Sequence, residues 1–148
     1  MKKTLIAAAA VALSLTAAAC HEEGKKVIDF EAMPETAKTF VQTHFADKQV
    51  SIVYFDRDVS GSEYELLFTD GANIDFNKKG EWKEVEDRDA DGVPTAVIPS
   101  AINNYVAQRH SGQYVIQIGK ENKEYEVKLN NGIEIVFNKN GDFVRYDD

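Results

Sequence analysis

Cysteine, histidine and basic residues are all scarce in this 148-residue chain, and each shortage excludes a kind of chemistry. Cys20 is the only cysteine, so no disulfide can form within the chain. The three histidines, His21, His44 and His110, show no spacing typical of a zinc site or a general base. No serine has a partner histidine at a recognisable spacing. The sequence therefore predicts a protein that is not an enzyme.

The shortage of basic residues limits the partners. The chain has 17 lysines and arginines against 25 acids, for a net charge of −8. Removal of residues 1–19 takes away two lysines and no acids, which leaves 15 against 25 and a charge of −10. Nucleic acid and anionic lipid surfaces are disfavoured by this charge. The expected partner is a protein, and a basic partner or a cation suits the charge best.

A long hydrophobic run occurs only at the start of the chain. Residues 5–19 are mostly apolar and follow two lysines, which is typical of an export signal. The run is too short and too rich in alanine for a membrane span, which needs about 20 residues. Two cleavage sites compete: Ala17 and Ala19 suit ordinary signal removal, while Cys20 resembles the lipidated cysteine of bacterial lipoproteins. We favour a lipoprotein anchored through Cys20 in the periplasm, outer membrane or cell surface, and the alternative is a soluble periplasmic protein.

The rest of the chain is organised around an internal repeat. Residues 64–85 align with residues 125–146 at 8 identical positions of 22, where average composition gives roughly one or two. The expected organisation is a signal peptide (1–19), a polar tether (20–26), a first unit (27–87) and a second unit (88–148).

Hydrophobic periodicity predicts the same elements in both units. Apolar residues from Met33 to Phe45 form one helical stripe over 34–45, and a similar stripe follows Ile98. Strands are expected at 50–56, 63–69, 72–76 and 81–86, with counterparts in the second unit. Asp70-Gly71 and Asn131-Gly132 suggest type I′ hairpin turns. The predicted fold class is α+β, with two tandem units in which a helix covers one face of a four-stranded antiparallel sheet.

Turn and core positions shared by the two copies of the repeat suggest a family. A proline-started helix and a V-x-x-V or V-x-x-I strand precede the pattern Y-E-x-x-x-x-x-G-x-x-I-x-F-[ND]-x-x-G-x-[WF] in both units. The residues that carry the pattern are Met33-Pro34, Val50, Val53, Tyr64, Gly71, Phe76, Gly80 and Trp82, and then Ile98-Pro99, Val115, Ile118, Tyr125, Gly132, Phe137, Gly141 and Phe143. This arrangement resembles the PepSY-like family of β-lactamase-inhibitor-protein-like (BLIP-like) proteins. The resemblance implies an exported protein with an open sheet face, which in the better-known inhibitor grips a hydrolase.

A helix can cover only one side of a sheet, so the other side is the expected partner-binding face. The residues assigned to it are Glu65, Leu67, Asp75, Lys128, Glu134 and Val136. Glu65 with Asp75, and Glu126 with Glu134, are expected to lie close together there. Trp82 has two interpretations, because it suits either the core or a binding hot spot.

The stretch DRDADG is the only local motif with a chemical meaning. Asp87, Asp89 and Asp91 alternate before a glycine, which matches the first half of a calcium loop built from hard oxygen ligands. The twelfth position, where such a loop has a bidentate glutamate, is Ile98. The other interpretation is a solvated acidic linker between the units. No other cofactor is expected.

These observations favour an exported, non-catalytic binding module that acts as a protein ligand or inhibitor of an extracytoplasmic hydrolase. The alternative is a calcium-dependent structural or surface-assembly lipoprotein. An enzyme is the third hypothesis, and it requires a deep pocket with convergent titratable groups.

Overall fold

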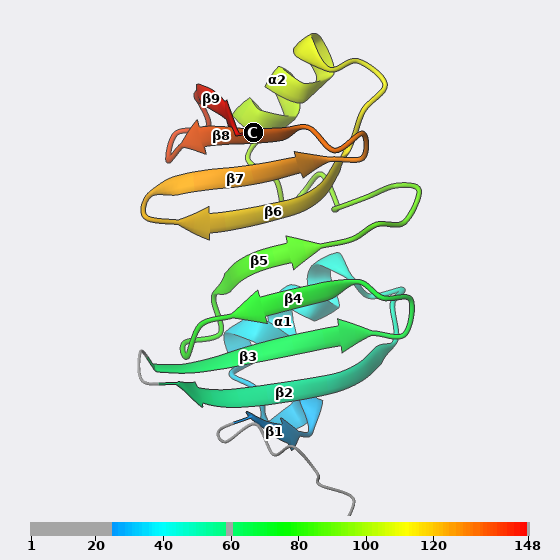
Figure 1. Cartoon of the computed structure of the whole chain (residues 1–148). Coiled ribbons are helices and arrows are strands. Elements are labelled where there is room, and N and C mark those ends of the chain that lie inside the picture. Colours follow the sequence, from blue (N-terminus) through cyan, green and yellow to red (C-terminus); the bar gives the residue numbers. More distant parts are fainter. Residues whose placement is uncertain (1–24, 59–60, 148) are drawn as a thin grey trace, which may run out of the picture.

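A single antiparallel sheet of nine strands forms the body of the protein. The structure is a computed structural model and describes residues 25–58 and 61–147. The order of the strands in the sheet follows the order of the chain, from β1 at one edge to β9 at the other (Figure 1). The strands are β1 (Lys25–Ile28), β2 (Val50–Asp58), β3 (Gly61–Phe68), β4 (Asn73–Phe76), β5 (Trp82–Glu86), β6 (Val115–Glu121), β7 (Glu124–Leu129), β8 (Glu134–Asn138) and β9 (Phe143–Asp147). The helices are the 3-10 helix η1 (Phe30–Ala32), α1 (Glu35–His44) and α2 (Ser100–Arg109).

Both α-helices pack on the same face of this sheet, and we call it the inner face. Strand residues two apart point to the same face, and one cross-strand row of inner residues runs through the whole sheet. This row consists of Ile28, Val53, Leu66, Ile74, Val85, Ile118, Val127, Ile135 and Tyr146. Ala37 and Val41 of α1 and Ile102 and Val106 of α2 belong to the same buried cluster. The first half (α1 and β2–β5) and the second half (α2 and β6–β9) therefore share one core.

The expected helices and strands are present, with small shifts in their ends. Helix α1 spans Glu35–His44, inside the expected range of 34–45. Glycines of the repeated pattern let the helices approach the sheet closely. A Cβ atom at Gly80 would lie 2.8 Å from the Cβ of Pro34, and one at Gly141 would lie 2.8 Å from the Cβ of Ala101. These contacts are too short for any residue with a side chain.

The turns differ from the sequence-based prediction. Asp70-Gly71 does not form a type I′ turn, because only Gly71 has a positive φ (95°) and its N–H donates to the carbonyl of Phe68. Gly132 has the same conformation, so the prediction for Asn131-Gly132 is also wrong. In both places a three-residue loop ends in a left-handed glycine, which is the usual alternative to the two-residue turn. Positive φ angles at two successive residues occur instead at Asn122 and Lys123, between β6 and β7.

Strand β1 is an element that the sequence analysis missed. It begins at Lys25 and pairs with β2, so the last two residues of the expected tether (20–26) belong to the sheet. The hairpin of β2 and β3 is also longer than expected, because two further pairs, Arg57 with Ser62 and Asp58 with Gly61, extend it. Neither α-helix of the described chain has the length and hydrophobicity needed to cross a membrane.

Candidate functional site

The face of the sheet opposite the helices, here called the outer face, carries a second continuous cross-strand row. The row consists of Val27, Tyr54, Glu65, Asp75, Glu84, Gly119, Glu126, Val136 and Arg145. Three acids on neighbouring strands therefore lie side by side at its centre. Gly119 follows them at the junction of β5 and β6, where the two halves of the sheet meet.

The central acid of the row, Asp75, is held in an unfavourable electrostatic environment. Its burial raises the pKa of the carboxyl, and the negative charges of Glu65, Glu84 and Glu63 raise it further, while Lys83 opposes them. The resulting pKa is about 6, compared with an ordinary value of 3.8. At neutral pH this carboxylate is charged at a cost, so a cation placed beside it would be stabilised.

The outer face is hollowed where Gly119 contributes no side chain. A depression of about 390 Å³ is lined by four acids and two lysines: Asp75, Glu84, Glu121, Glu126, Lys83 and Lys120, together with Gly119 and Asn122. A second depression of about 90 Å³ shares Glu84, Gly119 and Glu126 and reaches Val136. A Cβ atom at Gly119 would have only the Oε2 of Glu84 nearby, at 3.7 Å. Gly119 therefore leaves an opening in the middle of the face, lined by more acids than lysines, which we call the Gly119 hollow.

Cations border this acidic region. Lys25 pairs with Glu65 at 2.5 Å and Lys83 with Glu63 at 2.8 Å. Gln117 donates a hydrogen bond of 2.9 Å to the Oε1 of Glu84. These contacts fix several rim side chains, but Lys83 offsets only part of the effect of burial and neighbouring acids on the pKa of Asp75.

Most residues predicted for the partner-binding face lie on it. Glu65, Leu67, Asp75 and Lys128 are half-buried on the outer face, and Glu134 is exposed there. Glu65 is directly opposite Asp75, as expected. These positions follow directly from the alternation of side chains along each strand.

Two expectations about the second half need correction. Val136 lies in the outer row but is only 1% exposed, so it is not available to a partner. Its short side chain stands between Glu126 and Arg145, which have longer side chains. The expected pair of Glu126 with Glu134 is also absent, because Glu134 lies opposite Lys128 and their side chains form an ion pair of 2.5 Å.

Trp82 belongs to the edge of the core. Its ring is half-buried and stacks on Phe40 of α1, with 6.2 Å between the ring centroids. The ammonium of Lys120 lies over the same ring, 3.4 Å from its centroid. Trp82 therefore faces α1, on the side of the sheet away from the Gly119 hollow.

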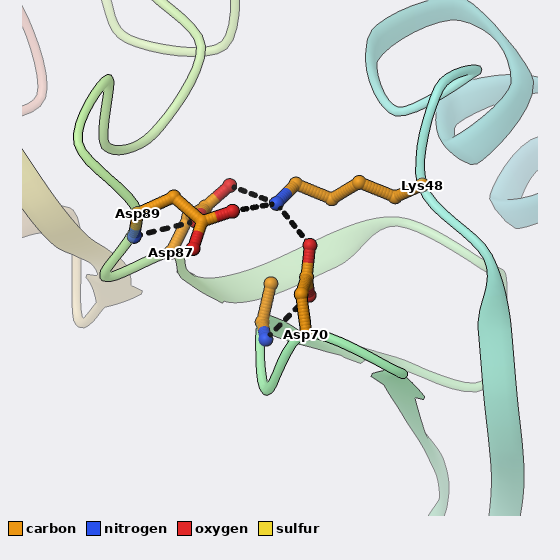
Figure 2. A network of polar contacts seen from close by, with 5 residues as sticks. Lys48, Asp70, Asp87 and Asp89 are labelled. Atoms are coloured by element: carbon orange, nitrogen blue, oxygen red, sulfur yellow. Dashed lines mark hydrogen bonds and ion pairs between the residues drawn. The ribbon is translucent and has the colours of Figure 1, made fainter.

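The DRDADG stretch folds around an internal cation. The ammonium of Lys48 lies 3.0 Å from the Oδ2 of Asp87 and 2.8 Å from that of Asp89. Asp70, from the β3–β4 loop, approaches the same ammonium at 2.5 Å. Figure 2 shows the three carboxylates converging on the end of the lysine side chain. The cluster ties the loop after β5 to the loops before β2 and after β3.

The charges of this cluster stabilise one another. Burial of the Lys48 ammonium lowers its pKa, but hydrogen bonds to Asp70, Asp89 and Asp87 outweigh that effect and raise the pKa well above its ordinary value. The hydrogen bond from Lys48 likewise lowers the pKa of Asp70. Asp87 is 2% exposed, so its carboxylate depends on this pairing.

The remaining predicted site residues lie elsewhere. Asp91 is exposed and does not join the carboxylates around Lys48. Within residues 25–58 and 61–147, no group of three or more histidine, cysteine or acidic side chains is arranged to hold a metal ion. Cys20 falls outside the described residues. Sequence reasoning missed Lys48 and Gly119, because neither belongs to a recognisable motif.

The protein is an α+β protein. Its nine-stranded antiparallel sheet has two α-helices on one face and an open, acidic opposite face. Residues 62–145 match the family described as "Putative beta-lactamase-inhibitor-like, PepSY-like". The chain belongs to this PepSY-like family, which confirms the resemblance found in the repeated pattern.

Solved structures of proteins with similar sequences share the fold. A "putative calcium-regulated periplasmic protein" from Bacteroides thetaiotaomicron is 35% identical, with a TM-score of 0.80 over 84% of this chain and 97% of that chain. A "putative periplasmic protein" from Bacteroides vulgatus is 36% identical, with a TM-score of 0.80 over 86% of this chain and 99% of that one. Another from the same species, "of unknown function", is 31% identical, with a TM-score of 0.78 over 84% and 100% of the two chains. No curated protein matches the chain.

The raised pKa of Asp75 predicts a pH-dependent effect of Asp75→Asn. A carboxyl whose pKa is higher in the folded state contributes stability below its ordinary pKa, and this contribution is lost as the pH rises through about 6. We expect Asp75→Asn to stabilise the protein by about 1 kcal/mol at about pH 8, after allowance for solvent screening, and to have no effect at about pH 3. Urea denaturation at the two pH values measures this difference. Asp47→Asn, at an exposed position, is the control and should change stability at neither pH, whereas an equal gain from Asp75→Asn at both would contradict the assignment.

Proposed function

We propose that this protein is an exported, non-catalytic binding module that holds a basic segment of a protein partner on its outer face. The observation that carries the proposal is the Gly119 hollow. It lies at the centre of the sheet, and the acids that line it, among them Asp75, Glu84 and Glu126, outnumber its two lysines, Lys83 and Lys120. Its position between the two halves lets a partner contact both of them at once.

Electrostatics favour a cationic side chain as the group that enters the hollow. Asp75 is partly desolvated and surrounded by other acids, so its charged form lacks stabilisation in the free protein. A lysine or arginine from a partner would supply a positive charge beside Asp75 and form charge-assisted hydrogen bonds with the carboxylates around the hollow. Such complementarity also speeds association and selects against acidic proteins.

The family supports a hydrolase as the class of partner. Its description as beta-lactamase-inhibitor-like refers to proteins that bind an enzyme. The periplasmic description of the related structures supports an extracytoplasmic location for the encounter. We therefore propose that the partner is an extracytoplasmic hydrolase with a basic loop, held or inhibited by the outer face.

Substitution of Gly119 tests the hollow directly. Gly119→Val adds a branched side chain that fills the opening, at a strand position that favours such residues. We expect affinity for the partner to fall by at least about tenfold, as for loss of a central hot spot. The partner is first captured by a photo-crosslinking residue at position 126 in the intact envelope, and its affinity is then measured by calorimetry.

Two controls distinguish this outcome from general damage. Ser51→Val adds the same side chain at an exposed position of β2 and should leave affinity unchanged. A photo-crosslinking residue at Gln108, exposed on α2, should capture nothing in common with position 126. Unchanged affinity of Gly119→Val, or the same partner captured from both positions, would refute binding through the outer face.

The name of one relative favours a second candidate function, a calcium-dependent structural or surface-assembly role. The Bacteroides thetaiotaomicron protein is described as calcium-regulated. In the present chain the carboxylates of Asp70, Asp87 and Asp89 are hard oxygen donors of the kind that calcium prefers, but they converge on Lys48. A calcium ion at this position would therefore compete with the lysine ammonium.

Calorimetric titration with calcium tests this second function. If the site binds calcium, Lys48→Met should tighten binding by about tenfold or more, because three carboxylates then lack their cation. Asp89→Ala should abolish binding. Asp91→Ala should preserve it, because Asp91 lies outside the cluster. Absence of binding at millimolar calcium in both the wild type and Lys48→Met would exclude the role.

We also propose that the exported chain is lipidated at Cys20. A lone cysteine directly after a signal-like apolar run supports this assignment. Metabolic labelling with palmitate should mark the wild type, and Cys20→Ser should lose the label and leave the membrane fraction. A wild-type chain that is unlabelled and soluble after export would instead support ordinary signal cleavage.

A further inference from the structure

Strand β9 leaves an apolar, open edge at the end of the sheet. It is the last strand in the sheet order, so within the described chain only β8 pairs with it (Figure 1). Four large hydrophobic side chains of the described chain are exposed, and three of them lie on β9. These are Phe143 at 40%, Val144 at 43% and Tyr146 at 49%.

The two edges of the sheet differ in how they resist pairing with other strands. Strand β1, at the opposite edge, has lysines at two of its four positions, Lys25 and Lys26. Lysines on an edge strand are a common protection against unwanted pairing. Strand β9 has no lysine and no proline, and its sole cation is Arg145. Its edge is therefore suited to receive another strand.

The corresponding strand of the first half shows which backbone groups are available. The 61-residue offset of the repeat aligns Val85 of β5 with Tyr146 of β9. Asp87, two residues beyond Val85, donates its N–H to the carbonyl of Ile116 at 2.9 Å. Backbone groups alternate sides along a strand, so Val85 also turns its N–H and carbonyl towards β6. By this correspondence Tyr146 turns the same groups towards the open edge.

We propose that β9 pairs in antiparallel fashion with β9 of a second copy of this chain, in a register centred on Tyr146. In this register Tyr146 faces its own counterpart, and the two residues exchange N–H to carbonyl hydrogen bonds across a two-fold axis. Arg145 of each copy then lies opposite Asp147 of the other. The interface runs along the β9 edge, away from the Gly119 hollow, and does not depend on the proposed function.

Charge complementarity selects this register. Opposite charges directly across an antiparallel pair are stabilising, and like charges are destabilising. A register centred on Arg145 would place two arginines opposite each other. Within one chain, Arg145 lies 3.6 Å from Glu124 and 3.8 Å from Asp147, which are long distances for charge-assisted hydrogen bonds. The arginine is therefore available to a closer partner.

Existing contacts hold Tyr146 in place for this role. Its hydroxyl lies 3.2 Å from the hydroxyl of Tyr105 and 3.2 Å from the Nε2 of His110, both within hydrogen-bonding distance. The ring of Phe143 stacks on Tyr105, with 5.2 Å between centroids. The apolar part of the Tyr146 ring would be covered by Tyr146 of the second copy. Because antiparallel pairing keeps equivalent faces on the same side, the two Gly119 hollows would open in the same direction.

Disulfide trapping tests the register. In a Cys20→Ser background, Tyr146→Cys should form a cross-linked dimer on mild oxidation, since directly paired residues lie about 5.5 Å apart between Cα atoms. Val144→Cys is the matched control and should not cross-link, because its counterpart lies several residues away along the paired strand. Equal cross-linking of both variants, or of neither, would overturn the proposal.

Sedimentation of charge-swap variants tests the interaction without cysteine chemistry. Arg145→Asp should raise the dissociation constant of the dimer by about tenfold or more, because the new acid faces Asp147 of the second copy. The double variant Arg145→Asp with Asp147→Arg should restore dimerisation, and thermal unfolding should show that each variant is folded. A wild-type protein that stays monomeric up to about 1 mM would refute the proposal. So would a double variant no better than Arg145→Asp, or oligomers larger than two formed through β1.

Discussion

The pairing of β5 with β6 is the contact on which the rest of this structure depends. Only three residue pairs form it, and Val85 and Ile118 at its centre are completely buried. On the inner face this pair joins the apolar rows of both halves into one core, which matters because a half of this size alone would have only a marginal core. On the outer face the neighbouring pair, Glu84 with Gly119, creates the Gly119 hollow. The short pairing of β5 with β6 therefore both joins the two halves of the core and forms the candidate binding site.

The sequence predicts what local patterns control and misses what long-range contacts control. Helical spacing placed Ala37 and Val41 in the core, and strand alternation placed Glu65 and Asp75 together on the outer face. The burial of Val136 depends on its neighbours in β7 and β9, which no local pattern reveals. The position of Lys48 beside Asp89, 41 residues later, likewise arises only when separate loops meet.

The two acidic regions of the protein differ in how far lysines of the chain offset the cost of burying a carboxylate. Around Lys48, one ammonium pairs directly with the buried carboxylate of Asp87 and with two further carboxylates, so this cluster stabilises the loops. Around Asp75, neighbouring acids add to the cost of burial and Lys83 compensates only in part. An uncompensated cost is retained in folded proteins mainly where function requires it. This contrast favours the outer face over the DRDADG loop as the site that meets a partner.

Differences between aligned positions of β5 and β9 follow from what lies beside each strand. Val85 is completely buried because β6 covers it, whereas Tyr146 at the aligned position is 49% exposed. Trp82 is covered by Lys120 from β6, whereas Phe143 has no strand beyond it in the described chain. Tyrosine suits a half-covered position, since its ring packs while its hydroxyl finds polar partners. The inner row of the sheet therefore ends at Tyr146, a residue that suits contact with either water or protein. This residue makes β9 suitable both as a free edge strand and as a strand paired with a second copy.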